Sequence, residues 1–215
     1  MHPRDVRFIG VAMPDQSKRA RIISSDTQRG RRVPPGQSET KKWPVLHYGD
    51  VPRIDLKRWD FRIMGAVESE WRCGWEEFRA LPWVDVQCDI HCVTRWSRLN
   101  NVFSGPSTRT VLEKVKVKPE GKFVLVHCEQ GFTTNLPLSE FLGDDCLFAI
   151  EHDGKPLEPD HGWPVRLVVP RLYFWKSAKW VRGIEILDQD VAGFWEQNGY
   201  HMHGDPWTEE RHSWE

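Results

Sequence analysis

The sequence predicts a β-rich α+β domain. Short runs that are apolar, or that alternate between apolar and polar residues, recur along the chain and are separated by Pro and Gly. Only brief stretches have a helical pattern, and no internal repeat is present. A chain of 215 residues is long enough to bury a sizeable core. Many short strands with few helices are typical of the α+β class.

The N-terminal part has a different composition from the rest. Residues 1–42 carry ten Lys and Arg against four acids and are rich in Ser, Pro and Gly. We expect a basic, flexible tail without a core of its own. Ordered sequence is expected to begin at Trp43, so that residues 43–215 form one domain. Pro44 and Pro52 exclude a helix directly after this boundary.

The first expected elements follow each other closely. Residues 59–67 place apolar side chains at every second position, which predicts a half-buried strand. Residues 75–81 have acids near their start and are followed by Pro82, which predicts a short helix. Residues 84–92 alternate without interruption and predict another strand.

The remaining elements are expected to be mostly strands. Residues 131–138 are expected to be a loop, and residues 138–142 one helical turn. Further strands are expected at residues 111–119, 123–128, 147–150, 165–169 and 180–187.

Cationic residues are concentrated in residues 161–182, HGWPVRLVVPRLYFWKSAKWVR, which contain no Asp or Glu. The cations are Arg166, Arg171, Lys176, Lys179 and Arg182. The same segment contains apolar runs, and an unpaired buried cation is costly. One interpretation is a half-buried groove whose cations face an anion such as phosphate. The other is a sheet edge that is paired with acids elsewhere on the surface.

The cysteines do not form a metal or disulfide motif. Cys88 and Cys92 share one face of the strand predicted at 84–92, and four residues separate them by roughly 13 Å at ~3.3 Å per residue. They can therefore neither bind one metal ion nor form a disulfide. The five cysteines are odd in number and lack framework spacing. Cys92, at the strand end, is either a reactive thiol facing a cleft or a small buried apolar residue.

Charge and hydropathy narrow the possible partners. The 30 Lys and Arg nearly balance 31 Asp and Glu, so nucleic acid is not an expected partner despite the basic tail. No apolar run approaches the ~18 residues of a membrane span. No export signal is recognised at the N-terminus, so we expect a cytoplasmic protein.

Four sequence blocks occur in an order that resembles the molybdopterin-binding domain of the sulfite oxidase family. They are CVTRWS at 92–97, GFTTNLPL at 131–138, HGWPVRLVVP…KSAKWV across 161–181, and GFWEQNGYHMHGDPW at 193–207. The resemblance covers about residues 43–207 and is closest to the short, single-domain bacterial members. It implies the β-rich mixed fold of that domain.

The resemblance also implies a site. It places the metal-ligating cysteine at Cys92 and the active-site tyrosine at Tyr200, with Arg95 as a further candidate beside the metal. The positions implied to contact the cofactor are His47, Cys92, Thr133, His161, Arg166, Ser177 and Lys179. A thiolate suits a soft, high-valent metal, and the cations suit a phosphate tail.

The implied cofactor is molybdenum–molybdopterin, and the implied reaction is a two-electron oxygen-atom transfer on a small molecule. A separate electron-transfer partner is also implied. Sulfite oxidases have an arginine two residues before the histidine that corresponds to His47, where this chain has Val45. Sulfite is therefore not the expected substrate. The alternatives are a sulfoxide or N-oxide reductase and a non-catalytic protein that binds the cofactor.

Overall fold

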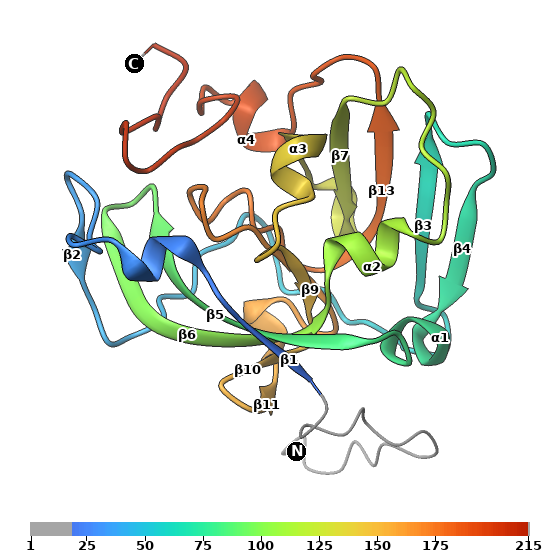
Figure 1. Ribbon diagram of the computed structural model, residues 1–215, viewed down its shortest axis with the longest axis horizontal. Coiled ribbons are helices and arrows are strands. Elements are labelled where there is room, and N and C mark those ends of the chain that lie inside the picture. Colours follow the sequence, from blue (N-terminus) through green and yellow to red (C-terminus); the bar gives the residue numbers. More distant parts are fainter. Residues whose placement is uncertain (1–18, 215) are drawn as a thin grey trace.

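A computed structural model of the protein describes residues 19–214 (Figure 1). Strands dominate and the helices are short, so the predicted β-rich α+β class is confirmed. The helices are α1 (Trp75–Arg79), α2 (Thr108–Leu112), α3 (Leu138–Phe141) and α4 (Phe194–Gln197). The 3₁₀ turns are η2 (Ser25–Gln28), η3 (Glu129–Gly131) and η4 (Pro159–His161).

The strands form two larger sheets and one two-stranded sheet. The first runs β1-β5-β6-β10-β11 with β2 beside β6: β1 (Ala20–Ile23), β5 (Trp83–Cys92), β6 (Trp96–Pro106), β10 (Glu151–His152), β11 (Lys155–Pro156) and β2 (Ser38–Glu39). The second is β4 (Trp71–Gly74), β3 (Asp60–Gly65), β13 (Val181–Leu187), β7 (Phe123–Cys128) and β8 (Thr133–Pro137). The third pairs β12 (Arg166–Val168) with β9 (Leu147–Ala149).

The hairpin of β5 and β6 is the longest pairing and positions Cys92. The two strands run antiparallel from Trp83 opposite Pro106 to Cys92 opposite Trp96. The register shifts between Cys88 and Ile90, which marks a β-bulge. Cys88 is fully buried in a small core, whereas Cys92 lies at the turn. All five cysteines are free, as the sequence predicted.

The expectation of a flexible tail over residues 1–42 is wrong for residues 19–42. Strand β1 pairs in parallel with β5, and β2 pairs in parallel with β6. The guanidinium of Arg32 donates two hydrogen bonds, of 2.8 and 2.7 Å, to the carboxylate of Asp89. This segment needs no core of its own, because it lies on an edge that the domain supplies. Residues 1–18 of the expected tail lie outside the described residues.

Two predicted elements have a different structure. Residues 111–119 were expected to form a strand, but α2 ends at Leu112 and only Val117 makes an isolated bridge. The hydroxyl of Ser107 accepts a hydrogen bond from the backbone N–H of Thr110 and caps this helix. Residues 131–138 were expected to be a loop, but β8 pairs antiparallel with β7. The sequence of β8, TTNLP, is mostly polar and lacks the apolar alternation that predicts a strand.

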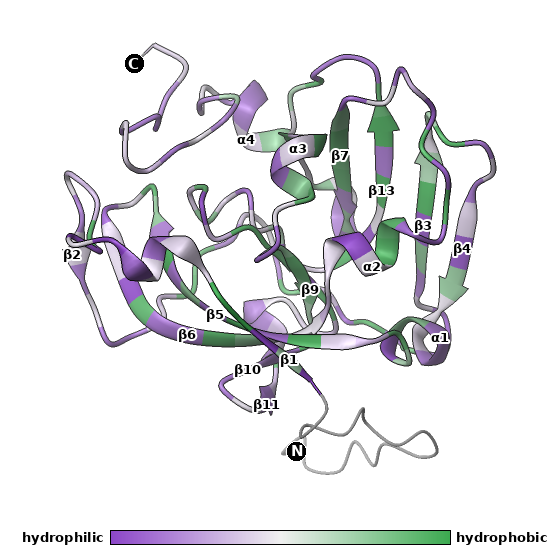
Figure 2. Cartoon of the chain, viewed as in Figure 1, coloured by the Kyte–Doolittle hydropathy of each residue, from purple (hydrophilic) through white to green (hydrophobic). Residues whose placement is uncertain are grey.

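The main core fills the space beside the second sheet. Its aromatic centre contains Phe61, Phe78 and Phe148, which are all fully buried, with ring centroids of Phe61 and Phe78 4.8 Å apart. Figure 2 shows hydrophobic and hydrophilic bands along β3 and β13, as expected for strands with one buried face. No described helix has the length and apolar character needed to cross a membrane.

We expect the Arg32→Met variant to lower the free energy of unfolding by about 2 kcal/mol, because Asp89 has no exposed side-chain surface and would lose its charged partner. Urea denaturation would measure this loss. Arg31→Met is the matched control, since Arg31 is exposed, and should change the free energy by less than about 0.5 kcal/mol. Equal effects of the two substitutions would contradict the assignment of this segment to the fold.

Candidate functional site

A cavity of about 490 Å³ lies where six segments meet. One wall comes from the turn between β5 and β6, and another from residues 43–49. The cavity is completed by residues 129–132, by residues 161–166, by the loop that leads from β12 to β13 and by the segment that carries α4. The cavity receives seven of the nine predicted site residues: His47, Cys92, His161, Arg166, Ser177, Lys179 and Tyr200.

Cys92 presents a mostly buried thiol to the cavity and is 9% exposed. Its backbone carbonyl accepts a hydrogen bond of 3.0 Å from the amide of Gln37. The hydroxyl of Thr94 donates to the sulfur at 3.1 Å. Burial raises the pKa of the thiol, and the hydrogen bond from Thr94 opposes this shift. A cation bound at the sulfur would stabilise the thiolate that burial disfavours.

Arg166 and Lys179 are cations without a carboxylate partner among the described residues. The guanidinium of Arg166, 2% exposed, donates to the carbonyls of His161 at 3.0 Å and Ser177 at 2.7 Å, while its Nε–H has no partner. Burial lowers the pKa of Arg166 to about 9. The ammonium of Lys179 donates to the carbonyl of Asp160 at 2.7 Å. Burial, followed by the charge of Arg166, lowers the pKa of Lys179 to about 7.

The other three cations of the basic segment are paired with acids. Arg171 contacts Glu140, and Arg182 contacts Asp60 and Glu129. Lys176 contacts Glu196. The interpretation of an anion-facing groove therefore applies to Arg166 and Lys179. The alternative, pairing with acids elsewhere in the chain, applies to the remaining three.

Two histidines flank these cations. The ring of His161 stacks on Trp43 with centroids 3.8 Å apart. Burial, and then the charge of Arg166, lowers the pKa of His161 to about 4, so the ring is neutral near pH 7. His47 lies edge-on to Trp180 at 5.6 Å, and its Nδ1 contacts the carbonyl of Gly49 at 2.9 Å. Neutral imidazoles can donate or accept a hydrogen bond to a polar ligand.

Tyr200 belongs to an aromatic part of the cavity wall. Its ring stacks on Trp195 at 5.0 Å and stands perpendicular to Trp175 at the same centroid distance. Burial raises the pKa of the phenol, and the nearby thiol of Cys92 raises it further. The hydroxyl therefore keeps its proton near pH 7 and can donate a hydrogen bond.

The structure does not bring Arg95 and Thr133 to the cavity. Arg95 has a φ of 73° in the hairpin turn, is exposed, and has its guanidinium beside Gly36. Thr133 pairs with His127 in the sheet. Sequence reasoning also missed Tyr48, Phe194 and Trp195 as parts of the wall. The aromatic sequence GFW at 193–195 was the only signal for two of them.

The residues of the cavity fit a molybdopterin cofactor. A thiol lies on its wall, and two cations and an unsatisfied guanidinium N–H lack a partner that a phosphate would supply. The hydroxyl of Ser177 accepts from the backbone N–H of Val169 at 2.9 Å and keeps the loop in place. The volume lies within the range of about 300–1,000 Å³ of pockets for small molecules and cofactors.

We expect sulfate to bind the cofactor-free protein more weakly as the pH rises from 6.5 to 8.5, by about tenfold, because Lys179 loses its charge above pH 7. Between pH 7 and 10.5 the unfolded chain holds this proton more than the folded protein. Lys179 therefore makes the free energy of unfolding rise with pH, and bound sulfate weakens that rise.

Titration calorimetry at pH 6.5 and 8.5 would measure the affinity for sulfate of the wild type, Lys179→Met and Lys155→Met. The pH dependence should disappear in Lys179→Met and persist in Lys155→Met, because Lys155 is exposed on β11. A pH-dependent affinity that survives in Lys179→Met would contradict this account.

The comparison with known proteins agrees with this geometry. Residues 48–195 match the family "oxidoreductase molybdopterin binding domain". An uncharacterized oxidoreductase, YuiH, of Bacillus subtilis is 49% identical over 86% of this chain and 93% of its own length. A putative protein-methionine-sulfoxide reductase subunit, YedZ1, of Azospira oryzae is 26% identical over 77% of this chain and 64% of its own length.

Longer relatives share only part of their length with this chain. The sulfite oxidase of Arabidopsis thaliana is 25% identical over 73% of this chain and 49% of its own length. The sulfane dehydrogenase SoxCD from Paracoccus pantotrophus has a similar fold, with a TM-score of 0.61, 23% identity, and coverage of 66% of this chain and 41% of its own. The family match spans more than half of the residues, so the chain belongs to the oxidoreductase molybdopterin binding domain family.

Proposed function

We propose that this molybdopterin-dependent oxidoreductase transfers an oxygen atom to or from a small, uncharged substrate, of which a sulfoxide and its sulfide are the simplest pair. The single observation that carries the proposal is the separation of charge along the cavity wall. Arg166 and Lys179 form one part of the wall, because Arg166 donates to the carbonyl of His161 and Lys179 donates to that of the preceding residue, Asp160. These two are the only Lys or Arg side chains among the described residues that line the cavity.

The part of the wall around Tyr200 is aromatic and contains no Lys or Arg among the described residues. Phe194 lies 4.7 Å from Tyr48 and 5.1 Å from Trp195, and Trp195 stacks on Tyr200. Val45, which occupies the position of the sulfite oxidase arginine, is 42% exposed and does not line the cavity. A sulfite or nitrate ion would lack a cationic partner beside Tyr200. This supports an uncharged substrate.

Seven residues of the cavity wall have a proposed task. The thiolate of Cys92 would hold the molybdenum, and Arg166 and Lys179 would bind the phosphate of the cofactor. His47, His161 and Ser177 would orient it by polar contacts. The hydroxyl of Tyr200 would donate a hydrogen bond to the oxygen of the substrate. Arg95 and Thr133 lie outside the wall, so the proposed site does not use them.

The reaction is balanced by two electrons and two protons. When the substrate is a sulfoxide, its S–O bond breaks and the oxygen leaves as water, while the sulfur is reduced to the sulfide. The bound molybdenum cofactor supplies the two-electron redox chemistry. We propose a separate electron-transfer protein as the source of the electrons. The cytoplasmic location stays a prediction, which cell fractionation would test.

The test of this function uses protein made in a host that produces the cofactor. Methyl phenyl sulfoxide would be supplied with reduced benzyl viologen, and sulfite would be supplied with ferricyanide in a parallel assay. We expect kcat/KM for the sulfoxide to exceed that for sulfite by at least about 30-fold, equivalent to the roughly 2 kcal/mol of one hydrogen bond to a charged group. Faster turnover of sulfite would overturn the proposal of an uncharged substrate.

We expect Cys92→Ser to lower the turnover of the sulfoxide by more than about 100-fold, because even changes around metal ligands cost 10–100-fold. The visible absorption of the metal should change. Pterin should remain bound and detectable, because Arg166 and Lys179 still hold the phosphate of the cofactor. Cys88→Ala is the matched control, since Cys88 lies on the same strand but does not itself line the cavity. An unchanged metal spectrum in Cys92→Ser would show that this thiolate is not the ligand.

A further inference from the structure

A buried ion pair lies directly behind the aromatic wall of the cavity. The ammonium of Lys176 is 2.6 Å from a carboxylate oxygen of Glu196, and neither side chain has exposed surface. Two charges removed from water are costly, and such a pair often stabilises a protein no more than apolar residues of the same size. Stability alone is therefore a weak reason for its presence beside the site.

The ammonium of Lys176 connects three segments of the chain. It donates to the backbone carbonyl of Asn135 at 2.8 Å and to the side-chain oxygen of the same residue at 2.9 Å. It also donates to the carbonyl of Met202 at 2.6 Å. Lys176 lies in the loop between β12 and β13, Asn135 in β8, and Met202 in the segment after α4. The ammonium of Lys176 thus ties the segment that carries Tyr200 to β8.

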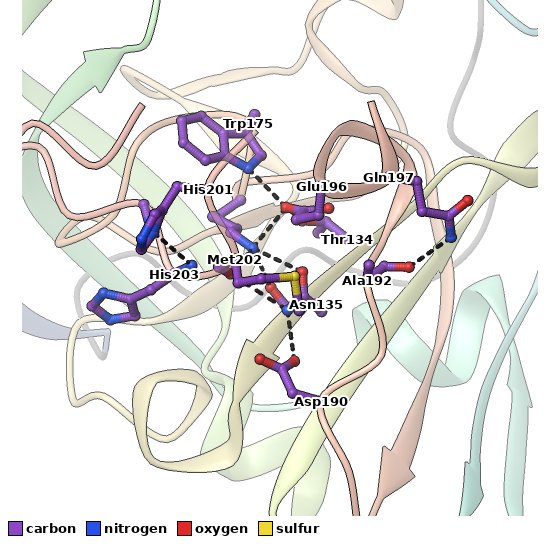
Figure 3. A network of polar contacts seen from close by, with 12 residues as sticks. Thr134, Asn135, Trp175, Asp190, Ala192, Glu196, Gln197, His201, Met202 and His203 are labelled. Carbon is purple, nitrogen blue, oxygen red and sulfur yellow. Dashed lines mark hydrogen bonds and ion pairs between the residues drawn. The ribbon is translucent and has the colours of Figure 1, made fainter. Parts of the chain in front are cut away.

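The carboxylate of Glu196 holds the rings that flank Tyr200. One of its oxygens accepts a hydrogen bond of 2.8 Å from the indole N–H of Trp175, and Figure 3 shows these two side chains pointing toward each other. Trp175 stands perpendicular to Tyr200 at an interplanar angle of 77°. Trp195, the residue before Glu196, stacks on the other side at 20°. Two of the three aromatic rings around Tyr200 are therefore connected to Glu196, and the third is His212, whose ring centroid is 5.5 Å away.

The residue before α4, Gly193, packs closely against β8. A Cβ atom at Gly193 would lie 2.5 Å from the Cα atom of Thr134, so only glycine permits this approach. The amide of Asn135 donates to the carboxylate of Asp190 at 2.6 Å, as Figure 3 shows. Contacts on both sides of α4 therefore leave the segment little freedom to shift Tyr200.

We propose that Lys176 and Glu196 are positioning residues, which set the hydroxyl of Tyr200 at the cavity wall through Trp175 and the segment after α4. This inference deepens the proposed function and rests on it, because Tyr200 is the group that would contact the substrate. Lys176 and Glu196 themselves do not line the cavity, so they act through Tyr200.

The first experiment compares holoenzymes by electron paramagnetic resonance of molybdenum(V), produced by partial reduction with dithionite without substrate. Glu196→Gln keeps an acceptor for the Trp175 indole and removes the charge that holds Lys176. We expect its spectrum to shift toward that of Tyr200→Phe, with molybdenum and pterin contents equal to those of the wild type. The control Arg19→Met breaks a 2.9 Å ion pair with Glu151 in the other large sheet, and its spectrum should match the wild type.

The second experiment is a double-mutant cycle on kcat/KM for the reduction of methyl phenyl sulfoxide. We expect Glu196→Gln to lower kcat/KM about tenfold in the wild-type background and less than twofold when Tyr200 is already Phe, because residues that act as one unit are non-additive. Equal effects in both backgrounds, or an unchanged spectrum in cofactor-loaded Glu196→Gln, would overturn the inference.

A milder variant covers the case in which Glu196→Gln does not fold. Asp190→Asn weakens only the outer contact with Asn135 and should shift the spectrum in the same direction by a smaller amount. No shift in a folded, cofactor-loaded Asp190→Asn protein would overturn the inference. If the wild type does not reduce sulfoxides, the proposed function fails, but the spectra still decide whether the ion pair positions Tyr200 beside the metal.

Discussion

The antiparallel pairing of β5 with β6 is the constraint on which the site depends. It places Cys92 opposite Trp96 at a turn of three residues, so the thiol projects from the end of the longest hairpin. Segments from both ends of the chain then close around this turn. Gln37 donates to the carbonyl of Cys92, and Arg211 donates to the carbonyl of Val93 at 2.7 Å. As the proposed metal ligand, Cys92 would have little freedom to move, which favours a fixed coordination geometry.

Charge is used in two different ways within one short stretch of the chain. Lys176 is buried against Glu196 and surrounded by acceptors, so its charge is already neutralised and holds the structure together. Lys179, three residues later, has a backbone carbonyl but no carboxylate as partner among the described residues, and its pKa is lowered to about 7. Arg166 likewise donates to backbone carbonyls and has no carboxylate partner among the described residues. A buried cation that lacks a carboxylate is poised for an anionic ligand, because such a ligand restores the interactions that burial removed.

The correct predictions came from residues whose pattern is local. Residues 84–92 alternate cleanly and form β5, and the four sequence blocks identified the family. Seven of the nine predicted site residues lie on the cavity wall. The errors came from residues whose structure depends on a distant partner. Ala20–Ile23 is a strand because β5 offers an edge, and Thr133–Pro137 is a strand because β7 lies beside it. Neither segment has the apolar alternation that predicts a strand from sequence.

The sequence by itself determined the β-rich class, the reduced state of the cysteines and the choice of residue types that suit a metal and a phosphate. These follow from periodicity, spacing and the chemistry of side chains, which are properties of the chain alone. Only the tertiary structure decided which of the five cations remain without an acid among the described residues, and that Arg95 does not line the cavity. It also decided that Glu196 lies behind Tyr200. The physical reason is that charge pairing and burial depend on contacts between residues far apart in the chain, which no local pattern records.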